Sequence, residues 1–261
     1  MTPAQLRQYL GFYQDLGVKN IYRRTPAPKP LAAEKPAPAA LPILASSALP
    51  TLASSGLPRI APAGLPPMAP AGDTLLSIRE DIGDCRRCGL CERRNQIVFG
   101  AGLENARLVF VGEGPGADED AQGLPFVGRA GQLLTQMIDN TASKEGIPIS
   151  RSDVYICNVV KCRPPENRTP LPEEMEICGQ FLFRQLMVLQ PKAICALGAT
   201  AAKALLATKD SVTSMRGKWH KWHDIPLIVT YHPSYLLRAY NQEAKREAWQ
   251  DLKKVLHSVY D

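Results

Sequence analysis

The chain has 261 residues, 23 prolines and a formal net charge of +6. Twelve prolines fall within residues 26–70, a stretch without aromatic residues or cysteine, which excludes one continuous globule. No apolar run reaches the roughly 18 residues of a membrane span, and the first residues lack the layout of a secretory signal, so we expect a cytoplasmic protein that does not contact membranes.

The first 72 residues predict an accessory extension in two parts. Residues 1–24 carry apolar side chains at helical spacing and indicate a short amphipathic helix, which could dock on a protein partner. Residues 25–72 are rich in Ala and Pro and predict a disordered linker. This extension holds seven Lys or Arg against two Asp or Glu, so the remaining chain is nearly neutral and would need a local basic patch to bind nucleic acid.

Residues 73–261 alternate between short apolar runs and helical patterns. The predicted strands are Ala106–Val111, Val154–Val160, Ala193–Leu197 and Pro226–Thr230. The predicted helices are one capped by Asp73 and running to about Ile82, Gly131–Thr141, Pro172–Leu189, Thr200–Ala207 and Gln242–Val259. This order predicts an α/β fold with three layers, α/β/α, around a central four-stranded parallel sheet.

Polar residues follow three of the four predicted strands, at the edge where ligands bind in such sheets. The first strand leads into residues 112–120, which read Gly-Glu-Gly-Pro-Gly-Ala-Asp-Glu-Asp. The glycine spacing does not match a dinucleotide fingerprint, and four carboxylates would repel a pyrophosphate. Carboxylates here suit water activation, cation stabilisation or metal binding.

Two sequence-distant cysteine pairs predict a metal site. The four residues are Cys85, Cys88, Cys162 and Cys178. Their spacing admits zinc or an iron–sulfur cluster and favours the second only mildly. Cys91 makes a further three-residue step and could compete as a ligand, whereas Cys157 and Cys195 lie in predicted strands and should be buried, inert thiols.

Several ordered motifs resemble those of the family 4 (iron–sulfur, thermostable-type) uracil-DNA glycosylases. They are Cys85-x2-Cys88, Val98-Phe-Gly-Ala-Gly102, Val111-Gly-Glu-Gly-Pro-Gly116, Pro125-Phe-Val-Gly-Arg-Ala-Gly-Gln-Leu-Leu134, Asn158-Val-Val-Lys-Cys-Arg-Pro-Pro-Glu-Asn-Arg168, Arg216-Gly-Lys-Trp219 and Tyr231-His-Pro-Ser-Tyr-Leu-Leu-Arg238. The resemblance covers about residues 80–256, and the N-terminal extension takes no part in it.

The resemblance implies a structural [4Fe–4S] cluster and a pocket for a flipped base. The cluster would be held by Cys85, Cys88, Cys162 and Cys178, without Cys91. Phe126 would stack on the uracil, Asn158 would read its O4 and N3–H edge, and His232 would bond O2, where negative charge grows.

Four further residues complete the implied base site. Glu113 and Asn167 would position water or stabilise the oxocarbenium-like sugar. The backbone of Gly114 would approach the substrate closely, and Glu119 lies near the same loop. No lysine occupies a nucleophile position, so we expect direct hydrolysis that releases uracil and leaves an abasic site.

The resemblance also implies contacts to DNA by a monomer. Leu236, Leu237 and Arg238 would form the wedge that fills the gap left by the flipped base. Lys161 and Arg168 are candidate phosphate contacts, and Arg129, Arg163 and Lys218 are further ones.

Two other functions remain open from the sequence. The glycosylase could act on hypoxanthine, xanthine or mismatched thymine, or the chain could be a non-catalytic iron–sulfur DNA-binding module. The basic, histidine-bearing insertion of a branch that links itself covalently to the abasic product is not seen, since the chain runs directly from Arg163 to Asn167.

Overall fold

The computed structural model describes residues 72–238 and 241–261. The predicted helix over residues 1–24 and the linker up to residue 71 lie outside the described residues. The α-helices are α2 (Leu75–Ile82), α3 (Ala117–Gln122), α4 (Arg129–Glu145), α5 (Pro172–Leu189), α6 (Ala199–Leu206), α7 (Val212–Met215), α8 (Pro233–Leu236) and α9 (Gln242–Tyr260). Short 3-10 turns are η1 (Gly89–Glu92), η2 (Arg151–Asp153) and η3 (Pro165–Asn167). None of the described helices is long and apolar enough to cross a membrane.

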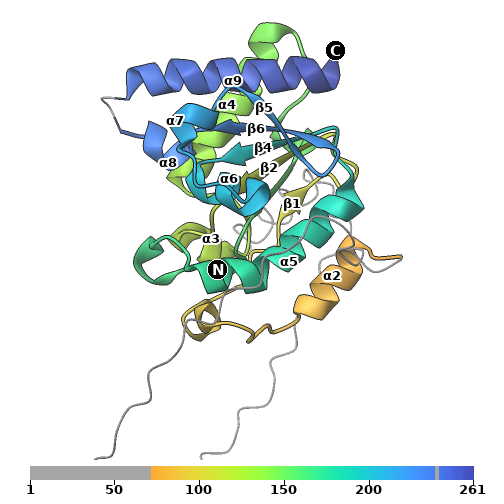
Figure 1. The fold of residues 1–261 in the computed structure, drawn as a ribbon, viewed down its shortest axis with the longest axis vertical. Helices are drawn as coiled ribbons and strands as arrows, with labels where there is room; N and C mark the ends of the chain where they lie inside the picture. The colour runs from red at the N-terminus through yellow and green to blue at the C-terminus, as the bar shows by residue number, and fades with distance from the viewer. Residues whose placement is uncertain (1–71, 239–240) are drawn as a thin grey trace, which may run out of the picture. The chain divides into compact units, whose positions relative to one another are not determined.

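A six-stranded sheet forms the middle of the fold (Figure 1). Its strands are β1 (Ala101–Gly102), β2 (Leu108–Gly112), β3 (Tyr155–Asn158), β4 (Ala193–Leu197), β5 (Trp219–Trp222) and β6 (Ile225–Thr230), in the order β1-β3-β2-β4-β6-β5. The four central strands are parallel and confirm the predicted sheet. The antiparallel edge strands β1 and β5 were not predicted, because β1 has two residues and β5 is mostly exposed, so neither forms an apolar run.

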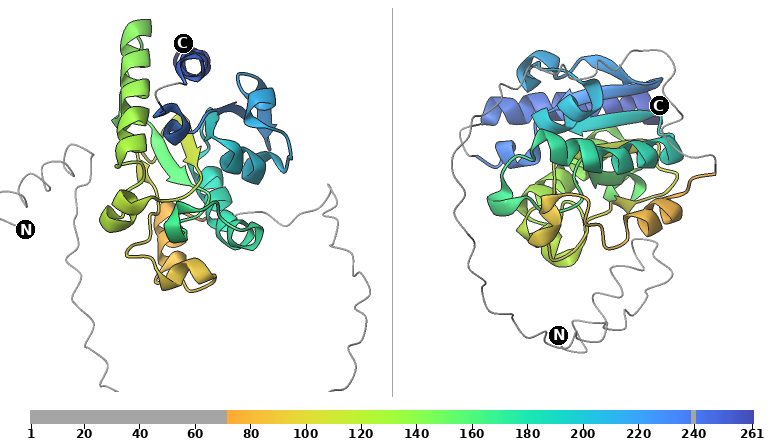
Figure 2. Two further views of the ribbon diagram at one scale, coloured as in Figure 1. Left: turned by 90° about the vertical axis from the view of Figure 1, so that its left-hand side faces the viewer. Right: turned by 60° about the horizontal axis from the view of Figure 1, so that its bottom comes forward.

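Helices cover both faces of this sheet, which confirms the three-layer prediction (Figures 1 and 2). Side chains alternate along β2: Val109 and Val111 pack with α2, α5 and α6, while Leu108 and Phe110 pack with α4 and α9. Cys157 and Cys195 are fully buried in the strands, as predicted, and the structure places them on opposite faces of the sheet. Because helices cover both faces, a ligand can reach the sheet only at the ends of its strands. In sheets of this kind the ligand site lies beyond the carboxyl ends.

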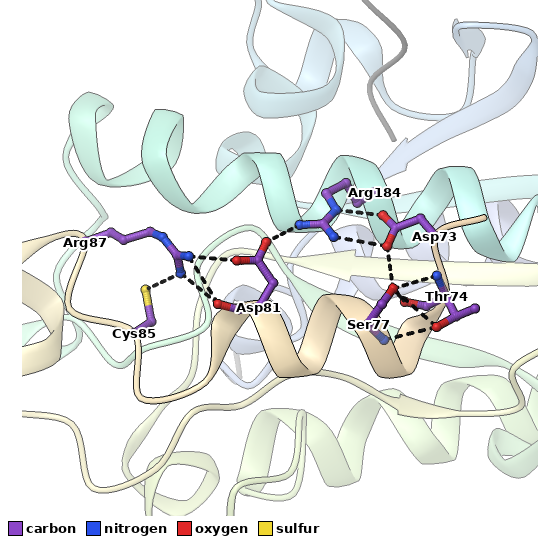
Figure 3. Close-up of polar contacts among 7 residues, drawn as sticks. All are labelled: Asp73, Thr74, Ser77, Asp81, Cys85, Arg87 and Arg184. Atoms are coloured by element: carbon purple, nitrogen blue, oxygen red, sulfur yellow. Dashed lines mark hydrogen bonds and ion pairs between the residues drawn. The ribbon is translucent and has the colours of Figure 1, made fainter. Parts of the chain in front are cut away.

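Helix α2 is fastened to α5 by ion pairs (Figure 3). Arg184 on α5 binds Asp73 with an Nε–Oδ2 distance of 2.7 Å and also pairs with Asp81. The prediction that Asp73 caps α2 was wrong: Thr74 is the cap, and its hydroxyl accepts a bond of 3.0 Å from the amide of Ser77. Both residue types can cap a helix, but the Asp73 carboxylate is engaged by a side chain 111 residues away.

Two helix glycines give a test of this packing. A Cβ on Gly179 in α5 would meet only Phe183 Cζ at 3.9 Å, whereas a Cβ on Gly131 in α4 would lie 1.9 Å from the carbonyl of Phe126. Gly179→Ala should therefore raise the free energy of unfolding by about 0.5–1 kcal/mol, and Gly131→Ala should lower it by about 1–3 kcal/mol. Denaturant unfolding measures both changes; equal effects of the two substitutions would contradict this packing.

Candidate active site and cysteine site

A pocket of about 350 Å³ opens at the carboxyl ends of the central strands. Its lining brings together all seven residues predicted as catalytic or substrate-binding. They are Glu113, Gly114, Glu119, Phe126, Asn158, Asn167 and His232. The loops after β2, β3 and β6 supply them, because parallel strands end at one edge of a sheet.

Asn158 is the last residue of β3 and presents an unpartnered acceptor. Its side chain is 1% exposed, and its Oδ1 has no hydrogen-bond partner. A Cβ on Gly112, its register partner in β2, would lie 2.4 Å from this oxygen and 2.5 Å from Phe126 Cζ. Glycine at 112 therefore permits the close approach of the amide and the aromatic ring. A buried acceptor without a partner costs stability, which is typical of a site that awaits a ligand donor.

Phe126 is held in an uncommon backbone conformation beside His232. Its φ is +53°, its side chain is buried, and its ring centroid lies 5.6 Å from that of His232. Both oxygens of the buried Glu119 carboxylate accept backbone amides, from Gly116 at 3.1 Å, Val127 at 2.9 Å and Gly128 at 2.8 Å. The Glu119 carboxylate therefore shapes the Phe126 loop, and a contact of Glu119 with the substrate stays a prediction.

Arg151 also holds this loop and was missed from the sequence. Its guanidinium donates to the carbonyl of Pro125 at 2.8 Å, to Thr135 Oγ1 at 2.8 Å and to the carbonyl of Gly131 at 3.2 Å. These hydrogen bonds hold the segment that carries Phe126 at both of its ends, Pro125 and Gly131. No local pattern around residue 151 indicated the role, since its partners lie 16 to 26 residues away.

His232 caps α8 and is poised as a neutral donor. The amide of Ser234 donates to Nδ1 at 3.2 Å, so Nδ1 acts as the acceptor and the ring proton belongs on Nε2. Protein atoms surround the ring, although it keeps some contact with solvent, and this desolvation lowers the pKa of His232 to about 4. At neutral pH the ring is an uncharged Nε2–H donor that lines the pocket.

Glu113 and Asn167 lie on the other two loops. Glu113 follows β2, and its carboxylate accepts a hydrogen bond from the Thr200 hydroxyl at the start of α6. Asn167 has φ of +56°, and its Oδ1 accepts from Arg163 Nε at 2.8 Å. Each side chain has one partner that fixes its direction at the pocket wall.

Five cysteines line a second, smaller cavity. They are Cys85, Cys88, Cys91, Cys162 and Cys178, and the rest of its lining includes Ile82, Ile97, Ile177 and Phe181. No three His, Cys, Asp or Glu side chains within residues 72–238 and 241–261 are grouped so as to hold a single metal ion.

Three N–H groups point at the sulfurs of this cavity. Arg94 Nη1 lies 3.4 Å from Cys162 Sγ, and the amide of Lys161 lies 3.3 Å from Cys178 Sγ. Arg87 Nη1 lies 3.5 Å from Cys85 Sγ and is held in turn by Asp81 (Figure 3). Burial raises the pKa of Cys162 to about 12, so the free thiol is protonated at neutral pH. Donors aimed at sulfur in an apolar setting fit thiolates that bind metal.

Comparisons with known proteins place the chain in one superfamily. A model of the uracil DNA glycosylase superfamily matches residues 99–253. A type-4 uracil-DNA glycosylase of Thermotoga maritima is 47% identical over 179 residues, which cover 68% of this chain and 90% of the relative. The chain belongs to the uracil DNA glycosylase superfamily, in its type-4 branch. The type-4 enzyme of Archaeoglobus fulgidus is 41% identical, and the match covers 70% of this chain and 92% of that enzyme. A type-5 enzyme of Pyrobaculum aerophilum is 33% identical, and the match covers 62% of this chain and 76% of that enzyme.

Two residues of this glycosylase predicted to contact DNA lie in the interior. Lys161 is 1% exposed, and its Nζ donates to the carbonyl of Asn158 at 2.8 Å and to Gln185 Oε1 at 2.6 Å. Leu236 is 1% exposed and packs with Ala244 and Ala248. The predictions of a phosphate contact at Lys161 and of a wedge at Leu236 are therefore wrong for this structure, because a buried group cannot meet DNA without unpacking the core.

Three more of the predicted DNA contacts, Leu237, Arg238 and Arg168, reach the surface. Leu237 is 37% exposed, and Arg238 is exposed with its guanidinium 5.9 Å from the ring centroid of Tyr235. Arg168 lines the pocket but forms two bonds of 2.7 and 2.8 Å with the Glu174 carboxylate. A phosphate at Arg168 would share the guanidinium with this carboxylate.

The low pKa of His232 gives a pH test. The pKa of His232 in the folded protein lies below the ordinary value of 6.5. Between pH 6.5 and about 4 the unfolded chain therefore binds the proton more readily than the folded one. The contribution of His232 to the free energy of unfolding is lost as the pH falls through that range. NMR titration of the imidazole should show its midpoint near 4 and the Nε2–H form at neutral pH. A midpoint near 6.5 would contradict the neutral-donor assignment.

Proposed function

We propose that the protein hydrolyses the N-glycosidic bond of uracil in DNA, releasing the free base and leaving an abasic site for repair. The observation that carries this proposal is the unpartnered, buried Oδ1 of Asn158 in a pocket that also holds an aromatic ring and a neutral histidine. A pocket this small and recessed suits a base that has left the helical stack.

Base identity follows from the Asn158 carboxamide. Its Oδ1 accepts the N3–H of uracil, while its amide group donates to O4. Cytosine presents an acceptor at N3 and an amino donor at C4, so both contacts become unfavourable. Phe126 stacks on the base face, which contributes affinity without distinguishing pyrimidines. Gly114 also lines the pocket, and its backbone can approach the base closely because glycine has no side chain.

His232 and Glu113 act on the breaking bond. Nε2–H of His232 donates to uracil O2, where negative charge grows as the base departs; a neutral donor is retained throughout, because the pKa of about 4 resists protonation. The Glu113 carboxylate, oriented by Thr200, stabilises the cationic sugar or aligns the attacking water. Asn167 assists from the opposite loop.

The cysteine site fits a [4Fe–4S] cluster held by Cys85, Cys88, Cys162 and Cys178. The inward N–H donors and apolar walls support a cluster of thiolates, and a four-iron cluster accepts thiolates set farther apart than one ion does. The cluster supplies a structural cross-link between the loop at residues 85–92, the segment after Asn158, and α5.

The substrate is uracil-containing DNA, single- or double-stranded. Leu237 fills the gap left by the flipped base, and Arg238 and Arg168 contact phosphates beside the pocket. The protein acts as a cytoplasmic monomer, with the N-terminal residues 1–24 available for a protein partner.

The reaction is tested on oligonucleotides with a single uracil. The protein should release uracil and leave an alkali-labile, uncleaved strand, and His232→Ala should slow release about 10²–10³-fold, the typical cost of removing one charge-stabilising donor. His223→Ala is the matched control, because His223 is exposed on the turn after β5, outside the pocket. An intact oligonucleotide would refute the proposal, and preferential release of hypoxanthine would shift the substrate class.

Base selectivity is tested by Asn158→Asp. A carboxylate accepts from the C4 amino group of cytosine but repels uracil O4, so uracil release should fall and cytosine release should appear. The control is Asn140→Asp on the exposed face of α4, which should leave both rates unchanged. Rates are measured on matched uracil and cytosine oligonucleotides, and unchanged selectivity in Asn158→Asp would remove the residue from base reading.

A further inference from the structure

A fifth cysteine shares the cavity of the four proposed cluster ligands. Cys91 lines the same cavity as Cys88 and is half-buried, so its thiol is neither packed into the core nor fully in solvent. The two remaining cysteines, Cys157 and Cys195, are buried inside strands and do not line this cavity. The cavity therefore offers one thiol more than a four-iron cluster binds.

Cys91 lies one turn from Cys88. Cys88 precedes the 3-10 turn η1, Cys91 is the third residue of that turn, and the amide of Cys91 donates to the carbonyl of Cys88 at 3.2 Å. Residues three apart along such a turn lie nearly above one another on the same side. Both thiols line the cavity from this one turn.

No further cysteine of the described residues lies beside Cys162 or Cys178 in the cavity lining. Cys162 and Cys178 are 6% and 9% exposed, and each sulfur is fixed by an N–H donor, from Arg94 and from the amide of Lys161. Cys178 lies within the long helix α5, which packs on the sheet. Only the loop that carries Cys85 has a spare thiol, and that loop is anchored through Arg87 and Asp81 (Figure 3).

We propose that Cys91 is an alternative cluster ligand that replaces Cys88 when Cys88 is lost, and that no residue replaces Cys162. When Cys91 binds, its thiol gives its proton to solvent as the iron–sulfur bond forms, so no oxidant or reductant is needed. This inference rests on the proposed [4Fe–4S] cofactor.

Iron and sulfide content test the exchange. Wild type, Cys91→Ser and Cys88→Ser should each retain the cluster and its visible absorbance, whereas the double variant Cys88→Ser/Cys91→Ser and the single variant Cys162→Ser should lose both. Cys88→Ser/Cys195→Ala is the matched double control and should keep the cluster. An iron content in Cys88→Ser as low as in the double variant would overturn the proposal. A wild-type protein without iron would instead refute the cofactor, and the two failures are thereby distinguished.

Two further measurements test the proposal, and the second does not depend on the folding of Cys88→Ser. Iodoacetamide should modify Cys91 in the loaded wild type and spare Cys91 in the loaded Cys88→Ser variant, as read by peptide mass spectrometry. Cys91→Ser, which changes only a half-buried side chain, should lose iron to a chelator faster than wild type and faster than Cys195→Ala. Equal rates of loss for Cys91→Ser and wild type would count against the spare-ligand role.

Discussion

The buried ammonium group of Lys161 joins the parts of this protein that carry its function. Nζ donates to the carbonyl of Asn158 and to Gln185 on α5, and Gln185 donates to the carbonyl of Phe99. The amide of the same lysine points at Cys178 Sγ. Burial lowers the pKa of Lys161, so the charge is tolerated only where such acceptors surround it. Asn158, helix α5 and the cysteine site are therefore positioned as one unit.

The pocket is preorganised by polar side chains that bind the backbone of its loops. The Glu119 carboxylate and the Arg151 guanidinium both hold the Phe126 loop, and the buried Asp120 carboxylate binds the amides of Asn95 and Gln96. That last contact links the pocket loop to the segment that follows the first cysteines. Loops tied down in this way present functional groups without losing further conformational entropy when the substrate binds.

Two features of the pocket cost stability, and the proposed function accounts for both. The Oδ1 of Asn158 is buried without a partner, and the ring of His232 is desolvated enough to hold its pKa near 4. Under the proposed function, each cost is recovered when a base with a matching donor and acceptor enters, because both groups then gain partners in a water-poor setting. An incorrect base would leave at least one of them unpaired, which is the physical basis of the proposed discrimination.

The amino-acid sequence by itself determined the parallel sheet, because apolar runs and helical periodicity are local patterns. It also placed Glu113, Asn158 and His232 at one edge, since loops after parallel strands converge there. Only the tertiary structure decided that Lys161 and Leu236 point inward, that Glu119 bonds backbone amides, and that Arg151 grips the Phe126 loop. Burial and hydrogen-bond partners depend on how the loops and helices pack against one another in three dimensions, which periodicity along the sequence does not encode.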